Sequence, residues 1–169
     1  MIIISDINIL ERLNFNLLIE LDLSQNEISD INILEKIDFK ELKELYLSKN
    51  YITDINIFEK VNFKELNKLD LYINNISDIK VLKKVKFQKL EELYLNWNKI
   101  SDINILEKLN FKELKKLRLA GNKIININVF EKFKLNKIEY LNISENKIDI
   151  DKNFLILSNL SKKIEQFIY

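Results

Sequence analysis

The chain of 169 residues contains no cysteine, no histidine and no proline, and Gly121 is its only glycine. Without cysteine no disulfide can form, and cysteine usage cannot identify the redox compartment. Without histidine and cysteine, a Ser-His-Asp triad, a thiol nucleophile and the usual zinc sites are all excluded. A single glycine excludes the glycine-rich loops that bind phosphate. The turns must therefore be made by Asn, Asp and Ser, whose side chains bond the local backbone.

The chain also lacks an excess of either charge, with 27 Lys and Arg against 26 Asp and Glu. A nearly neutral chain has no overall field to attract nucleic acid or an anionic membrane, so neither is expected as a partner. No apolar run approaches the roughly 18 residues that a membrane span requires, and residues 1–4 are too short for a signal peptide. The absence of both signals favours a cytoplasmic location. No acidic pair indicates a pocket that would perturb a pKa, so we expect neither an enzyme nor a cofactor or metal site.

What the chain does contain is a repeat of 24 residues. The pattern L-x-x-L-x-L-x-x-N recurs along the sequence, and its final asparagine stands at Asn26, Asn50, Asn74, Asn98, Asn122 and Asn146. Pattern and period together resemble the leucine-rich repeat family. The resemblance implies an α/β solenoid, with a curved parallel sheet on the concave face and short helical or 3₁₀ segments on the convex face. It also implies that each asparagine bonds the backbone of its turn.

The repeats predict a single leucine-rich repeat domain over residues 1–169. Residues 1–17 form a partial repeat, complete repeats begin at residues 18, 42, 66, 90, 114 and 138, and the end at 150–169 is irregular. Within that end, Ile164, Phe167 and Tyr169 fit a seventh strand after an insertion of two residues. Neither end shows a polar capping repeat, so we expect the core to stay open there and to favour end-to-end self-association.

Each repeat joins a strand pattern to a helical one. In segments such as 42–47 the first, fourth and sixth residues are apolar, and this alternation predicts one buried and one exposed face. After the asparagine the apolar spacing changes to three, and pairs such as Ser29-Asp30 are expected to cap one or two helical turns. A phenylalanine recurs once per repeat, at Phe15, Phe39, Phe63, Phe87 and Phe111, and Leu135 ends the series. This recurrence predicts an aromatic spine in the core rather than a cofactor pocket.

The candidate binding residues lie between the strand leucines. Strand alternation turns the third, fifth and seventh residues of each repeat toward the concave face and places the eighth at its rim. Four of the six tyrosines and the only tryptophan then share one face, and Tyr, Trp and Arg are enriched at binding hot spots. A preference of tyrosine for strands explains two of these positions well but explains Trp97 poorly. The candidate protein-binding residues are Tyr46, Asp70, Tyr72, Tyr94, Trp97, Arg118 and Tyr140.

The repeat segment Ser-Asp-Ile-x-x-Leu is similar to that of bacterial internalins and of the regulatory subunit of protein phosphatase 1. The sequence therefore favours a non-catalytic module that binds a protein partner through its concave face. Two alternatives remain: a structural or adhesive segment of a longer surface array, and a regulatory subunit that targets an enzyme. The sequence has one run of lysines, at Lys80, Lys83, Lys84, Lys86 and Lys89. We expect it on the convex side as a solvated surface rather than a site for phosphate or an acidic partner.

Overall fold

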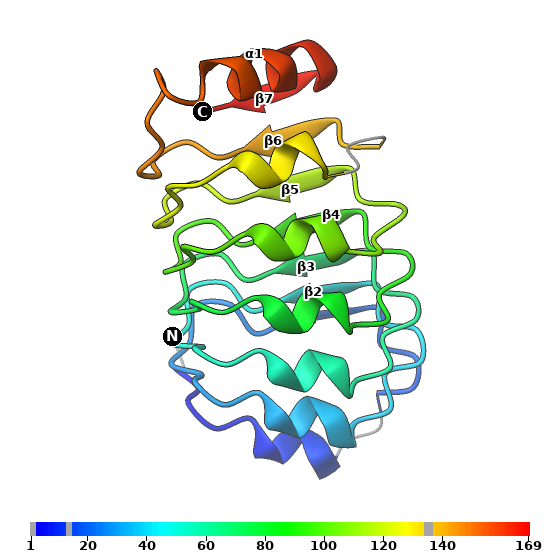
Figure 1. The fold of residues 1–169 in the computed structure, drawn as a ribbon. Helices are drawn as coiled ribbons and strands as arrows, with labels where there is room; N and C mark the ends of the chain where they lie inside the picture. Colours follow the sequence, from blue (N-terminus) through cyan, green and yellow to red (C-terminus); the bar gives the residue numbers. More distant parts are fainter. Residues whose placement is uncertain (1–2, 13–14, 134–136) are drawn as a thin grey trace.

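The computed structural model describes residues 3–12, 15–133 and 137–169 and contains one sheet of seven parallel strands in sequential order (Figure 1). Neighbouring strands are in register by one repeat, so that Leu45 aligns with both Leu21 and Leu69. The predicted solenoid with a parallel sheet is therefore confirmed. The strands are β1 (Glu20–Asp22), β2 (Glu44–Tyr46), β3 (Lys68–Asp70), β4 (Glu92–Tyr94), β5 (Lys116–Arg118), β6 (Tyr140–Asn142) and β7 (Gln166–Ile168).

Each strand is three residues long, shorter than its six-residue apolar pattern. Backbone hydrogen bonds between repeats nevertheless continue past the strand ends, from the N–H of Leu47 to the carbonyl of Asp70 at 2.8 Å and from Lys49 to Tyr72 at 2.7 Å. The pattern therefore marks the whole stretch along which one repeat bonds the next, of which the strand is the regular centre.

Short 3₁₀ helices lie on the side opposite the sheet, in front of the strands in Figure 1. Asp30 Oδ1 accepts the N–H of Asn32, the first residue of its helix, at 2.8 Å, and Asp54 and Asp102 act in the same way. The aspartate stands one residue before the formal cap position, Ile31, which makes no side-chain cap bond. The helices are η1 (Asn8–Arg12), η2 (Asn32–Lys36), η3 (Asn56–Glu59), η4 (Lys80–Lys83), η5 (Asn104–Lys108) and η6 (Asn128–Glu131).

The repeating asparagines form a ladder of hydrogen bonds inside the solenoid. Asn98 Nδ2 donates to the carbonyls of Leu71 and Leu95 at 2.9 and 3.1 Å, and Asn98 Oδ1 accepts the N–H of Ile76 at 2.9 Å. Leu71 and Ile76 belong to the preceding repeat, so the side chain joins two turns. The predicted role of the asparagines in bonding turn backbone is confirmed.

The phenylalanine spine is present over four repeats. Ring centroids are 5.7 Å apart for Phe15 and Phe39, 5.7 Å for Phe39 and Phe63, and 6.0 Å for Phe63 and Phe87. Over the described ranges no ring contact continues from Phe87 to Phe111, which is half-buried. The expected end of the spine at Leu135 lies outside the described residues.

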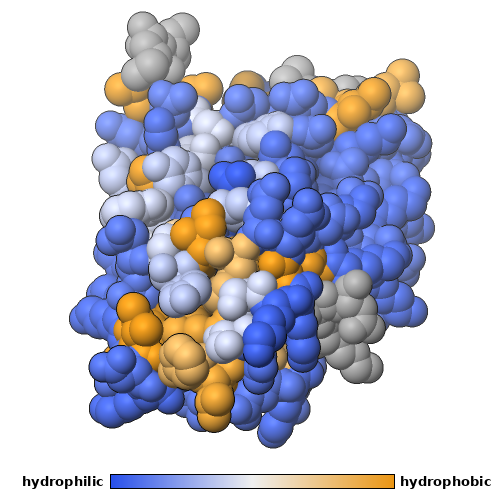
Figure 2. All heavy atoms as spheres, turned by 90° about the horizontal axis from the view of Figure 1, so that it is seen from above, coloured by the Kyte–Doolittle hydropathy of each residue, from blue (hydrophilic) through white to orange (hydrophobic). Residues whose placement is uncertain are grey.

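The C-terminal end holds helix α1 (Phe154–Lys163), which the sequence pattern did not predict, followed by strand β7. Leu157 and Leu160 of α1 pack into the core and cover it, so the expectation of an open core is wrong at this end, although Phe154 and Leu155 are exposed. Phe167 aligns with Leu141, which confirms the seventh strand. Figure 2, which views the molecule from the α1 end, shows hydrophobic surface there. No helix in the described part of the chain is long and apolar enough to span a membrane.

Candidate functional site

Aromatic rings and cations alternate along the outer face of the sheet, the concave face. Lys68 Nζ lies 4.8 Å from the ring centre of Tyr46 and 5.5 Å from that of Tyr94. Arg118 Cζ lies 4.3 Å from the ring centre of Tyr94 and 5.1 Å from that of Tyr140. A cation over a ring contributes about 0.5–1 kcal/mol at an exposed site, so each contact helps to hold its ring in place. The cations thus lie between the tyrosines that the sequence placed on this face.

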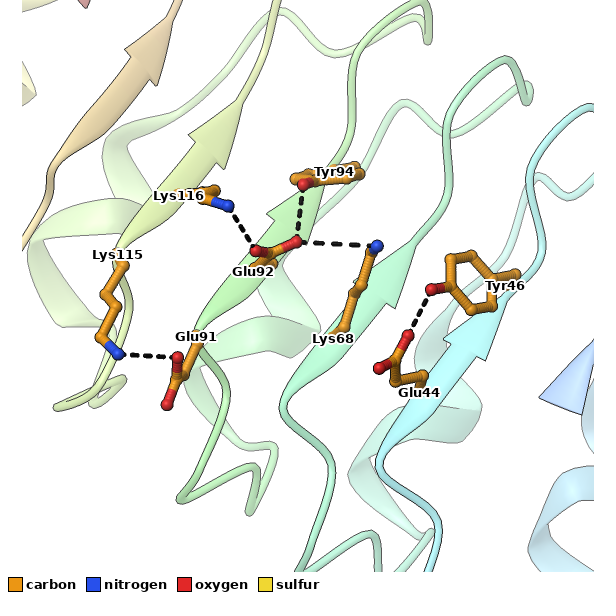
Figure 3. A network of polar contacts seen from close by, with 8 residues as sticks. All are labelled: Glu44, Tyr46, Lys68, Glu91, Glu92, Tyr94, Lys115 and Lys116. Carbon is orange, nitrogen blue, oxygen red and sulfur yellow. Dashed lines mark hydrogen bonds and ion pairs between the residues drawn. The ribbon is translucent and has the colours of Figure 1, made fainter. Parts of the chain in front are cut away.

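Glu92 connects three of these strands (Figure 3). Its carboxylate accepts hydrogen bonds from the Tyr94 hydroxyl at 2.6 Å and from Lys116 Nζ at 2.7 Å, and Lys68 Nζ lies 3.7 Å away. Partial burial alone would raise the pKa of Glu92, but the hydrogen bonds from Lys116 and Tyr94 lower this pKa below its usual value. Glu92 is therefore ionised at neutral pH and fixes its neighbours.

The tyrosine hydroxyls on this face are held in their protonated, donating form. Partial burial, followed by the hydrogen bond to Glu92, raises the pKa of Tyr94 far above its ordinary range. Tyr46 donates to Glu44 in the same way (Figure 3), and this bond is the first cause of its own raised pKa. Both hydroxyls are therefore oriented before any partner arrives.

Asp70 and Tyr72 lie at the end of β3. Asp70 Oδ1 accepts the N–H of Tyr72 at 2.9 Å, and burial is the main cause that raises the pKa of this carboxyl, opposed by that N–H bond and by Lys68 and Arg118. Asp22 and Asn142 make the equivalent bond to Ser24 and Ser144 at 2.8 and 3.0 Å. Asp70 therefore shapes the end of its strand in addition to lining the concave face.

Trp97 lies at the rim in the left-handed backbone region, with φ of 57°. The side chain is 52% exposed. The sequence did not predict this conformation, because Gly121 is the only residue at the equivalent position of the other repeats that favours it. Every complete repeat has the same conformation at this position, in Gln25, Lys49, Ile73, Trp97, Gly121 and Glu145.

The lysine run in and after η4 is a mixed surface on the opposite side of the molecule. Lys84 pairs with Glu59 at 2.9 Å, and Lys89 pairs with Glu65 at 2.5 Å. Lys83 and Lys86 are exposed and have no ion pair within the described residues. This arrangement agrees with the predicted solvated surface.

Comparison with protein-family models matches two stretches of the chain to leucine-rich repeats. The model described as "Leucine Rich repeats (2 copies)" matches residues 16–60 and 40–84, and that described as "Leucine Rich repeat" matches residues 88–103. A search of curated proteins found no match.

Two solved structures similar to this chain are internalins of Listeria monocytogenes str. 4b F2365. For the internalin inlF the TM-score is 0.72 at 26% identity, over 98% of this chain and 51% of that one. For internalin C2 (inlC2) the TM-score is 0.67 at 23% identity, over 89% of this chain and 60% of that one. The chain thus spans about half the length of the first internalin.

Proposed function

The chain belongs to the leucine-rich repeat family, and from this membership we propose that it is an interaction module whose concave face binds a protein partner. The alternation of rings and cations from β2 to β6 is the observation that supports this choice of face. Tyrosine and arginine are the residue types that dominate binding hot spots. The binding residues are proposed to be Tyr46, Asp70, Tyr72, Tyr94, Trp97, Arg118 and Tyr140.

The fixed geometry of the concave side chains favours binding. Tyr94 is held by Glu92 through its hydroxyl and by Lys68 and Arg118 over its ring. Ordering a free side chain on association costs about 0.5–1.5 kcal/mol, and a side chain already ordered avoids most of this loss. Rigid tyrosines also supply a large contact area.

A second candidate function is a segment of a longer adhesive surface array. The likeness to internalin chains of greater length favours it. The two candidates differ in where binding energy arises. An array segment would keep its function after substitution of single concave residues, whereas a binding module would not.

We expect Trp97→Ala or Tyr94→Ala to weaken the complex by about 2 kcal/mol, roughly thirtyfold in affinity, because truncating a hot-spot aromatic removes its buried contact area. The partner is first captured from source cells by affinity purification and identified by mass spectrometry. Titration of each variant by calorimetry then measures the affinity, and circular dichroism checks the fold. A double variant on the opposite side, Lys83→Ala with Lys84→Ala, serves as control. Loss of binding in this control with full binding by Trp97→Ala would assign the site to the lysine run instead.

We also propose that the 169-residue chain self-associates end to end. Phe154 and Leu155 are exposed at the α1 end, and Leu17 and Ile19 are exposed at the β1 end. Exposed apolar ends and open strand edges favour pairing. Sedimentation velocity at rising concentration should show species larger than a monomer, and Leu155→Lys should reduce them. The exposed Ile125, away from both ends of the solenoid, provides the control Ile125→Lys. A monomer at millimolar concentration would refute the proposal.

A further inference from the structure

The indole of Trp97 rests directly on the backbone of Gly121. These residues occupy the same position in neighbouring repeats. The backbone N–H of Trp97 donates to the backbone carbonyl of Ala120 at 2.7 Å. A Cβ atom at residue 121 would lie 2.6, 2.9 and 3.0 Å from three atoms of the indole. Any other residue at position 121 would force the indole to move, so the only glycine leaves the space that the only tryptophan fills. One ring face is thereby covered, and the rest of the side chain remains exposed.

Ile73 extends the apolar surface of Trp97 by one repeat toward the N-terminal end of the solenoid, and Lys49 follows at the same position. Ile73 occupies the equivalent position in the preceding repeat and is 38% exposed. Neighbouring parallel strands are about 4.8 Å apart, which brings Ile73 and Trp97 within reach of one side chain of a partner. Tyr72, which precedes Ile73, is half-buried.

Three lysines form a row that begins beside Trp97 and continues toward the C-terminal end of the solenoid, away from Ile73. Lys99, Lys123 and Lys147 each lie two residues after a rim position, which is at most about 7 Å along the chain. Their N–H groups bond the carbonyls of the preceding repeats at 2.8, 2.8 and 2.9 Å, so the backbone holds the three in register. All three side chains are exposed, and none has an ion pair among residues 3–12, 15–133 and 137–169. The only acidic residue in the adjoining rim column is Glu145.

In another column of the repeat, Lys36, Lys60 and Lys84 each pair with a glutamate of the preceding repeat, at 3.4, 3.1 and 2.9 Å. Lys108 and Lys132 continue that column on the opposite side of the molecule and have no ion pair within the described residues. In the earlier repeats the position of Lys99 is occupied by Glu27, Tyr51 and Asn75. In this column the positive charge therefore begins at the repeat of Trp97 and extends over three consecutive turns.

We propose that this rim binds an acidic segment of the protein partner, which places one apolar side chain against Trp97 and Ile73 while its carboxylates face Lys99, Lys123 and Lys147. The assignment rests on the proposed function and names the chemistry of the partner. Opposite charge steers the encounter and fixes orientation, and the apolar contact supplies the anchor. Gly121 is a positioning residue, because it acts only by letting the indole lie flat.

The electrostatic part can be tested on the free protein, since Trp97 is the only tryptophan and reports alone on the rim. The quenching constant of each ion is divided by its quenching constant for free N-acetyltryptophanamide. The corrected constant should be at least about twofold larger for iodide than for caesium, because the lysines attract the anion. In the triple variant Lys99→Gln, Lys123→Gln, Lys147→Gln the preference should disappear. The matched control, Lys83→Gln, Lys86→Gln, Lys108→Gln, removes three exposed lysines elsewhere and should keep it. Equal quenching by the two ions in the unmodified protein would overturn the proposal.

The partner chemistry is tested with three nine-residue peptides: one phenylalanine flanked by aspartates, the same peptide with serine for phenylalanine, and the same peptide with lysines for aspartates. Only the first should shift the Trp97 emission, and its affinity should fall about tenfold in the lysine triple variant. Gly121→Ala should lift the indole, increase quenching by neutral acrylamide and weaken the first peptide.

Equal binding of the acidic and basic peptides, or no binding of either, would refute the acidic-segment assignment. The proposed function has a separate readout, because it fails only if Trp97→Ala and Tyr94→Ala leave the affinity for the captured partner unchanged. The acidic-segment assignment can therefore fail while the proposed function stands, and the two failures are distinguishable.

Discussion

Phe63→Ala is expected to lower the free energy of unfolding by about 3–5 kcal/mol, the range for removing a buried phenylalanine. The Phe63 side chain is 1% exposed and lies in the middle of the aromatic spine. Its ring centroid is 5.7 Å from that of Phe39, 6.0 Å from Phe87 and 6.5 Å from Phe58. The substitution leaves a cavity and removes three aromatic contacts at once, and neighbouring repeats cannot shift into the gap without breaking the sheet register.

Urea denaturation followed by circular dichroism measures this loss. Phe154→Ala is the matched control, because the Phe154 side chain is 64% exposed and surface substitutions usually change stability by no more than about 0.5 kcal/mol. If the two variants unfold at the same urea concentration, the spine does not stabilise the fold.

Asn98→Ala should lower the free energy of unfolding by about 1–3 kcal/mol, the cost of one buried backbone group left unsatisfied. The Asn98 side chain is 7% exposed, and its removal leaves the N–H of Ile76 without its partner. The carbonyls of Leu71 and Leu95 each lose one donor but still accept from Asn74 at 3.2 Å and from Asn122 at 2.9 Å. Thermal unfolding of Asn98→Ala beside Asn104→Ala measures the effect, since Asn104 is exposed and its side chain makes no hydrogen bond within the described ranges.

Asn98→Asp separates the two halves of this bonding pattern. A carboxylate can still accept from Ile76 but cannot donate to the carbonyls of Leu71 and Leu95. Burial beside carbonyl oxygens would raise the pKa of the new carboxyl in the folded state. Below about pH 4 the variant should therefore be at least nearly as stable as Asn98→Ala. It should lose stability as the pH rises from the unfolded-state pKa of the carboxyl to its raised folded-state pKa. Stability equal to that of the unmodified protein at neutral pH would show that the donor function is dispensable.

The repeat made most of the fold predictable, because one period determined strand register, asparagine ladder and phenylalanine spine together. Where the period stopped, prediction stopped as well. Helix α1 lies in the stretch where Ile150 and Asp151 break the pattern, and the apolar run that follows gives no clear choice between helix and strand. Strand β7 could be predicted, since Phe167 recovers the register of Leu141.

The candidate site was predictable as a set of columns but not as a set of contacts. Alternation assigns Tyr94 and Arg118 to one face, yet whether a cation lies between two rings depends on side-chain rotamers that no periodicity records. The lysine row at Lys99, Lys123 and Lys147 did leave a signal, a fixed offset of one residue from the ladder asparagine. The row lies just outside the columns that strand alternation assigns to the concave face, so the alternation does not identify it.

The asparagine ladder also determines how the molecule responds to force. Its bonds join only turns that are neighbours along the chain, such as Ile76 to Asn98 and Asn98 to Leu71. A pull on the two ends is therefore opposed at each moment by one interface between turns, and the outermost interface gives way first. Each detached turn of 24 residues adds at most about 86 Å of extended chain. Under tension the solenoid behaves as an extensible spring that lengthens in equal small steps, unlike a globular domain that ruptures as a whole.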